Sequence, residues 1–214
     1  WPAKGNPYAK GKNGKDLTIV QDLAPFVDVD SNGLYNPVKG DFPDIRGNQH
    51  VFWVFNDLGD NWPGINTEDL GLEIQANAFA YKSEIEAINN ATFYSFNFIS
   101  RDTVELHDMY IGIWVDVMIG NGNNDYVGCD SIRNMGIAYN GERFDQDVFT
   151  PYNGYGFNPP LLGVKILENT QCKTDTKQLT KMSFFKTYYG GASVTSAPNG
   201  TDDYHEYLQG LWRD

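Results

Sequence analysis

The sequence has few basic residues and no long apolar run. Among its 214 residues, 16 Lys and Arg stand against 28 Asp and Glu, which gives a formal net charge of −12. This charge repels phosphate backbones and anionic lipids, so no nucleic-acid partner is expected. No stretch approaches the roughly 20 apolar residues that span a bilayer, so no direct membrane insertion is expected either.

The first residues of the chain and its cysteine content allow two further predictions. The first residues, 1–7, lack a charged region followed by an apolar one and lack an initiator Met, so they are not a signal peptide. We therefore expect the chain to be part of a longer protein. The two cysteines, Cys129 and Cys172, suffice for one disulfide, which is the prediction, with two buried thiols as the alternative.

Motifs for nucleophilic or zinc-dependent hydrolysis are also missing. The chain has three histidines and no Gly-x-Ser-x-Gly elbow. The segment beginning at His205 and Glu206 starts like a zinc-protease helix, but Gln209 stands where the second zinc-binding His is needed. A glycoside hydrolase needs only two carboxylates across a cleft, and the candidates for that less favoured alternative are Asp57, Asp60, Glu68 and Glu73. The prediction is a protein without enzymatic activity.

What the sequence does contain favours strands and turns. Aromatic residues make up 14% of the chain and Gly numbers 22. We expect an all-β fold, an antiparallel β-sandwich or jelly roll with long loops and a short C-terminal helix, as a single domain over residues 1–214 with an irregular N-terminal segment at 1–16. The expected strands are 17–20, 51–55, 72–80, 92–99, 109–117, 135–139, 161–167 and 179–189. A short helical turn is expected at 83–88 and a helix at 202–211, where Asp202 and Asp203 complement the helix dipole.

Alternation within the strand at 72–80 predicts which side chains are buried. Its apolar residues, from Leu72 to Ala80, alternate with Glu73, Gln75 and Asn77, so the first set should face the core and the second should lie near solvent. Trp53 and Trp114, inside predicted strands, are expected in the core.

The clearest functional feature is an acidic loop at 28–34. It places Asp28, Asp30 and Asn32 at the first, third and fifth positions of an EF-hand-like loop, with Gly33 at the sharp turn and the carbonyl of Leu34 at the seventh. The twelfth position holds a Lys in place of the bidentate Glu, and Asp41 is the expected replacement. The loop predicts a structural Ca²⁺ site. The alternative is a cluster of Asx-turns without metal.

A second and weaker calcium site is predicted in the Gly-rich stretch at the end of the predicted strand at 109–117. Its candidate ligands are Asp116, Asn121, Asn123, Asp125 and Asp130. The acidic turn at Asp145 and Asp147 is interpreted as a solvated loop or a support for a nearby site.

Six segments together point to a known group of proteins: Trp-Pro-Ala-Lys-Gly-Asn-Pro at 1–7, Leu-Ala-Pro-Phe-Val-Asp-Val-Asp at 23–30, Gly-Asp-Phe-Pro-Asp-Ile at 40–45, Trp-Val-Phe-Asn-Asp at 53–57, Asp-Tyr-Val-Gly-Cys-Asp at 125–130 and Leu-Gln-Gly-Leu-Trp-Arg-Asp at 208–214. These segments resemble a domain of large secreted Bacteroidota proteins that end in a type IX secretion sorting domain. The resemblance implies an extracellular or cell-surface location, neighbouring domains in the same chain and no known enzymatic activity. Such relatives carry an Asp two residues after the position of Asp116, where this chain has Met118.

The predicted function is a calcium-stabilised structural or adhesive module of a secreted or cell-surface protein, with surface glycans or other surface proteins as possible partners. The main alternative is a carbohydrate-binding module that stacks sugars on Trp62, with Tyr152 and Tyr155 as further candidates. Thr103 and Ser131 each follow an Asp and precede an apolar residue, a pattern that resembles bacterial O-glycosylation sites.

Overall fold

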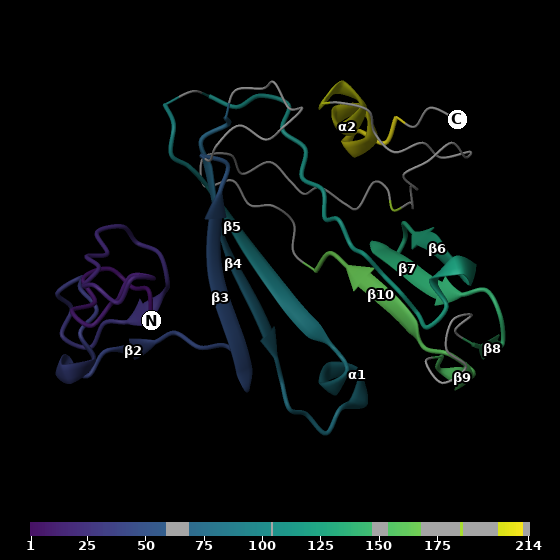
Figure 1. Cartoon of the computed structure of the whole chain (residues 1–214), viewed down its shortest axis with the longest axis horizontal. Coiled ribbons are helices and arrows are strands. Elements are labelled where there is room, and N and C mark those ends of the chain that lie inside the picture. Colours follow the sequence, from purple (N-terminus) through teal and green to yellow (C-terminus); the bar gives the residue numbers. More distant parts are fainter. Residues whose placement is uncertain (59–68, 104, 147–153, 168–184, 186–200, 212–214) are drawn as a thin grey trace. The chain divides into compact units, whose positions relative to one another are not determined.

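A computed structural model of the whole chain describes residues 1–58, 69–103, 105–146, 154–167, 185 and 201–211 (Figure 1). The chain divides into two compact units, Trp1–Leu106 and His107–Asp214. The described residues form antiparallel sheets with few helices and a short C-terminal helix, which confirms the predicted mostly-β fold class. That residues 1–214 act as a single domain stays a prediction.

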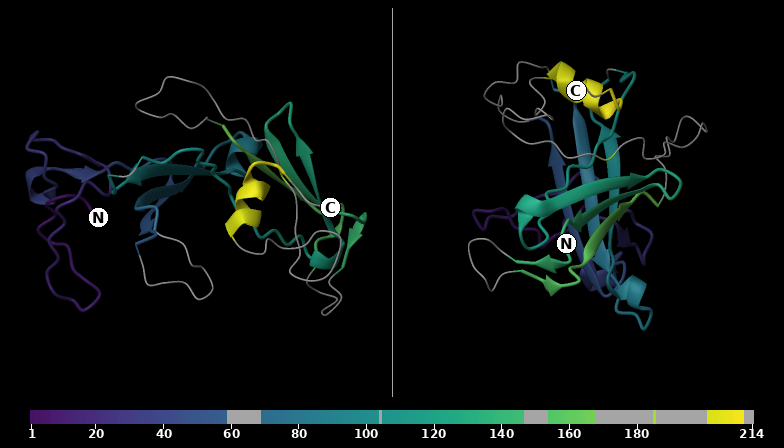
Figure 2. Two further views of the ribbon diagram at one scale, coloured as in Figure 1. Left: turned by 90° about the horizontal axis from the view of Figure 1, so that it is seen from above. Right: turned by 90° about the vertical axis from the view of Figure 1, so that its right-hand side faces the viewer.

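The first unit is built on a three-stranded antiparallel sheet of β3 (Gln49–Asn56), β4 (Leu72–Ala80) and β5 (Thr92–Ser100), with β4 in the centre. The predicted strands at 51–55, 72–80 and 92–99 are thus confirmed, and the three strands run side by side in every view (Figure 2). The helical turn expected at 83–88 is the four-residue helix α1 (Glu86–Asn89), in the connection from β4 to β5.

Two short strands and a 3₁₀ helix precede this sheet. β1 (Phe26–Val27) pairs antiparallel with β2 (Phe42–Pro43), and η1 (Pro37–Lys39) lies between them. The prediction of a strand at 17–20 is wrong, because the backbone of this segment bonds to turns of the N-terminal region and not to a neighbouring strand. The amide of Leu17 donates to Ala9 O, and Ile19 O accepts from the amide of Gly5. Within it Ile19 is buried and Val20 is exposed.

The N-terminal region covers the face of the sheet that carries the polar residues of β4. Gln75 Nε2 donates to the backbone oxygen of Asp22 at 2.8 Å, and the ring of Trp1 lies 5.7 Å from that of Phe52. Glu73 and Gln75 are therefore buried, at 6% and 7% exposure. The expectation that these side chains lie near solvent is wrong.

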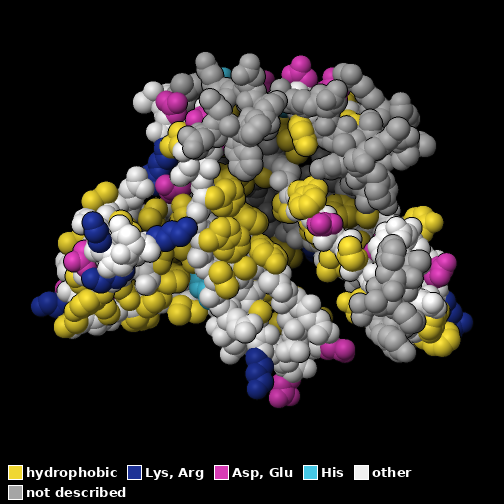
Figure 3. All heavy atoms as spheres, viewed as in Figure 1, with side chains coloured by type: hydrophobic (Ala, Val, Ile, Leu, Met, Phe, Trp, Pro, Cys, Tyr) yellow, Lys and Arg dark blue, Asp and Glu magenta, His cyan; other side chains and the backbone are white. Residues whose placement is uncertain are grey.

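The opposite face of the same sheet carries apolar residues that are only partly buried. Ala76 is fully buried, but Trp53 is 36% and Tyr94 60% exposed. Tyr94 and Phe96 stack with their rings 6.4 Å apart. Apolar side chains gather on the surface over this unit (Figure 3). The alternation in 72–80 thus predicts the strand correctly. It does not predict which face of the sheet is covered, because the N-terminal region lies on the polar face.

The second unit contains the antiparallel sheet β10–β7–β6, formed by β6 (Asp125–Asp130), β7 (Met135–Asn140) and β10 (Leu161–Lys165). The strands predicted at 135–139 and 161–167 are confirmed, while β6 was not expected as a strand. A second pair, β8 (Phe144–Asp145) and β9 (Gly156–Phe157), lies between β7 and β10 in sequence. The 3₁₀ helix η2 (Gly122–Asn124) leads into β6.

Helix α2 (Thr201–Leu208) confirms the predicted C-terminal helix, with Asp202 and Asp203 in its first turn. The strand expected at 109–117 is wrong. This stretch pairs with no strand in the part of the chain that the structure describes, and it packs on α2: the ring of Tyr110 lies 5.4 Å from that of His205, and a Cβ on Gly112 would overlap Leu208. Trp114, expected in the core, is 71% exposed. The strand expected at 179–189 falls outside the described residues except for Phe185, which lies over Gly136 of β7.

Candidate metal centre

The short β1–β2 pair explains how the acidic loop closes. Val27 of β1 is the register partner of Phe42 of β2, so the next residue on one strand, Asp28, and the preceding residue on the other, Asp41, are brought to the same end of the ladder. Strand pairing thus brings to the loop the carboxylate that was predicted to replace the missing twelfth EF-hand ligand. The loop is not flanked by the two helices of an EF-hand.

Side-chain hydrogen bonds hold the loop in a tight conformation. Asp28 accepts from the amides of Asn32 at 3.2 Å and Gly33 at 2.7 Å, and Asn32 Oδ1 accepts from the amide of Leu34 at 2.7 Å. Ser31 and Gly33 both adopt positive φ angles, of 57° and 76°. Gly33 provides this conformation without strain, as the sequence pattern predicted.

Asp41 is the buried member of the cluster, at 3% exposure. Its Oδ1 accepts from the amide of Val29 at 2.9 Å and its Oδ2 from the amide of Asn36 at 2.7 Å. Each oxygen therefore ties down one end of the loop and keeps a second lone pair for another ligand. Burial without a cationic side chain would be costly for this carboxylate if the amides did not stabilise its charge.

Three carboxylates converge in this loop. Asp28, Asp30 and Asp41 each offer an oxygen, and these oxygens lie within 4.8 Å of one another. Oxygens that bind one Ca²⁺ at 2.3–2.6 Å lie at most about 5 Å apart, so the cluster has the dimensions of a calcium site. Its donors are all hard oxygens, which suit Ca²⁺ and not Zn²⁺.

The remaining predicted ligands of this loop lie beside the cluster. Asn32 Nδ2 donates to Asp30 at 2.8 Å, so its amide group adjoins the carboxylates. The amide of Tyr35 donates to Lys4 O at 2.7 Å, and a Cβ on Gly5 would lie 2.9 Å from Leu34. Leu34 thus joins the loop to the N-terminal region, while ligation by its carbonyl stays a prediction.

The second predicted calcium set does not come together. Asp125 begins β6 and Asp130 ends it, so their Cα atoms are about 17 Å apart and their side chains lie on opposite faces. Asp130 pairs instead with Arg133, whose hydrogen bonds lower the pKa of the Asp130 carboxyl. Asp116 is exposed, in the extended stretch that packs on α2. Asn121 caps η2 by accepting from the amide of Asn123 at 3.2 Å. This set is therefore corrected, because Asp125 and Asp130 cannot bind one ion.

Asp145, interpreted from the sequence as part of a solvated loop or as a support for a nearby site, is fully buried at 1% exposure, which excludes the first interpretation. It accepts from the amide of Asn121 at 3.0 Å, from Asn140 Nδ2 at 3.1 Å and from the amide of Tyr155 at 2.7 Å. One carboxylate thus joins the loop before η2, the end of β7 and the start of β9. No spacing rule in the sequence identifies it, because its partners are mostly backbone amides from distant segments. Asp147 lies outside the described residues.

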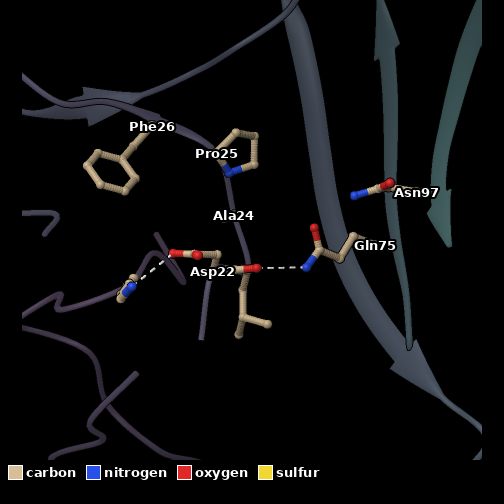
Figure 4. A pocket seen from close by; sticks show the side chains of 8 residues that line it. Asp22, Ala24, Pro25, Phe26, Gln75 and Asn97 are labelled. Carbon is tan, nitrogen blue, oxygen red and sulfur yellow. Dashed lines mark hydrogen bonds and ion pairs between the residues drawn. The ribbon is translucent and has the colours of Figure 1, made fainter. Parts of the chain in front are cut away.

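The candidate sugar-binding residues are only partly placed. Trp62 and Tyr152 fall outside the described residues, and Tyr155 is 61% exposed. A shallow pocket of about 340 Å³ lies in the first unit, between the N-terminal region and the sheet. The amides of Gln75 and Asn97 line it on the sheet side and Pro25 and Phe26 on the other (Figure 4).

The carboxylates considered for glycoside hydrolysis have other partners where they are described. Asp57 accepts from the amides of Leu70 at 2.6 Å and Leu72 at 2.9 Å, and Glu73 is paired with Arg101. Asp60 and Glu68 lie outside the described residues. Both described carboxylates are thus hydrogen-bonded at the start of β4.

The predicted modification sites are accessible where they are described. Thr103 and Ser131 are both exposed, the first beside Asp102, whose carboxylate accepts from the Thr103 amide. Cys129 is exposed on β6, and its predicted disulfide partner, Cys172, lies outside the described residues. Glycosylation and the disulfide stay predictions.

No family model, curated protein or solved structure matches the chain. The resemblance to secreted Bacteroidota domains accordingly stays an expectation from the sequence. Within the described part of the chain, neither helix has the length and apolar character needed to cross a membrane.

Proposed function

We propose that this chain is a non-enzymatic structural or adhesive module of a secreted or cell-surface protein, and that calcium at the Asp28 loop stabilises it. The convergence of the carboxylates of Asp28, Asp30 and Asp41 is the observation that carries this proposal. Their mutual repulsion would be relieved by a divalent cation, and one ion would fix the loop between β1 and β2.

The position of the loop explains what such an ion would do for the fold. The loop contacts the N-terminal region through Leu34 and Tyr35, and that region in turn covers the β3–β4–β5 sheet through Trp1 and Asp22. A cation there would act as a cross-link for a region with little regular secondary structure. Its role would be structural, since α1 and η1 are too short to undergo the helix reorientation of a calcium sensor.

The charge and composition fit an extracellular setting, where calcium is abundant enough to fill weak sites. A net charge of −12 also suits a soluble surface module that avoids nucleic acid and anionic lipid. Neighbouring domains of the same chain, surface glycans or other surface proteins are the proposed partners.

The calcium proposal is tested by thermal unfolding of the 214-residue chain in calcium and in chelator. A site saturated at 100 times its dissociation constant adds about 2.7 kcal/mol to the free energy of unfolding, so the melting temperature should rise clearly with calcium. The Asp30→Asn variant should lose most of this increase. Asp44→Asn, an exposed carboxylate just after β2, is the matched control and should keep it. Equal melting with and without calcium would rule the proposal out.

A carbohydrate-binding role is the second candidate, and the pocket beside Gln75 and Asn97 is the observation that favours it. Amide groups opposite an apolar wall suit the hydroxyl groups and the apolar face of a sugar ring. Titration with a panel of mono- and oligosaccharides tests this role, and binding should be lost in Asn97→Ala. The absence of binding across the panel would leave the structural module alone.

A further inference from the structure

One carboxylate oxygen in the second unit is buried and has no hydrogen-bond partner. Among the described residues, Asp125 Oδ1 is the one buried side-chain oxygen or nitrogen with this property. Its sister atom Oδ2 accepts from the amide of Ile119 at 2.7 Å, so the side chain is fixed in place. Buried polar atoms in folded proteins nearly always have a partner, and an orphaned carboxylate oxygen points to an ion or a water that completes its shell.

The neighbourhood of this atom is rich in oxygen. Asn140 is the register partner of Asp125, and its Nδ2 lies 2.8 Å from Asn124 Oδ1, 3.1 Å from Asp145 Oδ1 and 3.4 Å from Ile119 O. An amide NH₂ group has two hydrogens, so it cannot satisfy three oxygens at once. Three oxygens thus share the one NH₂ group of Asn140 at this end of the β6–β7 ladder.

The loop before η2 is shaped to close over this cluster. Gly120 has a φ of 64°, and a Cβ at this position would overlap the carboxylate of Asp145. The backbone therefore passes directly over two carboxylates, Asp125 and Asp145, with no Lys or Arg in contact with either among the described residues. Their negative charge is balanced by backbone amides and one Asn.

We propose that the β6–β7 end of the second unit binds a hard divalent cation, Ca²⁺, through Asp125 Oδ1, with oxygens of the surrounding cluster as the remaining ligands. Asn124, Asp145 and the carbonyl of Ile119 supply carboxylate, amide and carbonyl oxygens, the three kinds of protein ligand that Ca²⁺ takes. Asn140 holds these oxygens together.

This site differs from the one that the sequence pattern indicates. Asp130 is excluded by its position at the far end of β6, and Asp145 enters the set. The inference does not rest on the Asp28 loop, because the two clusters belong to different units and share no residue.

Calorimetric titration of the metal-free 214-residue chain with calcium alone tests the proposal. The wild type should bind two ions and Asp30→Asn, which impairs the first loop, should bind one. Asp125→Asn in the Asp30→Asn background should abolish binding or weaken it at least about tenfold, because a charged ligand is lost. Asp116→Asn in the same background is the matched control and should bind as tightly as its parent.

The two proposals fail separately in this design. Loss of the ion in Asp125→Asn but not in Asp30→Asn would support the second site and rule out the first. An ion retained at unchanged affinity when Asp125→Asn is combined with Asp30→Asn would overturn the second site and assign a buried water to Oδ1. If Asp125→Asn does not fold, as judged by circular dichroism, Asn124→Asp decides: added charge should raise calcium affinity several-fold, and a folded variant without that gain overturns the proposal.

Discussion

Arg101 holds the carboxylate of Glu73 with two hydrogen bonds, from Nη2 to Oε1 at 2.7 Å and from Nε to Oε2 at 3.3 Å. The side chain of Glu73 is almost fully buried and that of Arg101 is one third exposed. The pair joins the start of β4 to the residue that follows β5, at the same edge where Gln75 bonds the N-terminal region. A buried charge in a small sheet is thus tolerated because its partner is bidentate and keeps contact with water.

This pair predicts an acid-sensitive contribution to stability. The hydrogen bond from Arg101 lowers the pKa of Glu73 below its ordinary value of 4.5. The contribution is therefore complete above pH 4.5, the value for the unfolded chain, and is lost as the pH falls below it through the lowered pKa of the folded state. Unfolding in urea at pH 7 and at steps down to pH 3 measures it.

The Glu73→Gln variant should be destabilised by about 2–3 kcal/mol at pH 7, because Arg101 loses its charged partner, and by much less at pH 3. Glu84→Gln, an exposed carboxylate before α1, serves as the control and should follow the wild type at every pH. A constant difference between Glu73→Gln and wild type across this range would contradict the assignment.

Asp41 should matter to the fold even in the absence of metal. Replacing it with Asn puts an NH₂ group against the amide of Val29 or Asn36, which leaves a buried donor without an acceptor at a cost of about 1–3 kcal/mol. Asp30 is exposed, and Asp30→Asn should change stability in chelator by less than about 0.5 kcal/mol. Chemical unfolding of both variants in chelator measures the difference, and equal stabilities would count against the two-amide role of Asp41.

Gly120 should resist substitution more strongly than Gly156, which also has a positive φ. In Gly120→Ala the new Cβ overlaps the buried Asp145 carboxylate in addition to the backbone strain, and we expect a loss of at least about 3 kcal/mol. Gly156→Ala, with a φ of 72° and open space around the Cβ position, carries the strain alone and should cost about 1–2 kcal/mol. Hydrogen exchange or chemical unfolding compares the two. Similar losses would show that the carboxylate moves aside.

The strands whose burial alternates were predictable from the sequence. Alternating residues in 72–80 and 92–99, and the apolar run at 51–55, lead directly to β4, β5 and β3, because a period of two needs no knowledge of distant contacts. The covered side of the sheet could not be read in this way. Gln75 and Glu73 are buried because hydrogen bonds from Gln75 to Asp22 and from Arg101 to Glu73 satisfy them, and such partners lie far away in sequence.

The stretch at 109–117 was predicted as a strand but does not form one in the structure. Its apolar and aromatic residues have strand propensity, but a strand exists only where a neighbouring backbone completes the ladder. Here Tyr110 and Gly112 contact α2 instead. β6 contains Asp and Gly, which have low strand propensity, but it is a strand because its backbone pairs in register with β7.

The sequence by itself determined the acidic loop: the order of Asp28, Asp30, Asn32 and Gly33 sets the turn and its local hydrogen bonds, all within a few residues. The sequence also indicated Asp41 as the closing carboxylate, but only the tertiary structure shows how Asp41 reaches the loop and that Asp145 joins the other cluster. Asp41 reaches the loop through the β1–β2 register, and Asp145 meets the loop before η2 through contacts 24 residues apart in the chain. Ligand spacing encodes local geometry, whereas strand pairing and burial bring together groups that no local pattern connects.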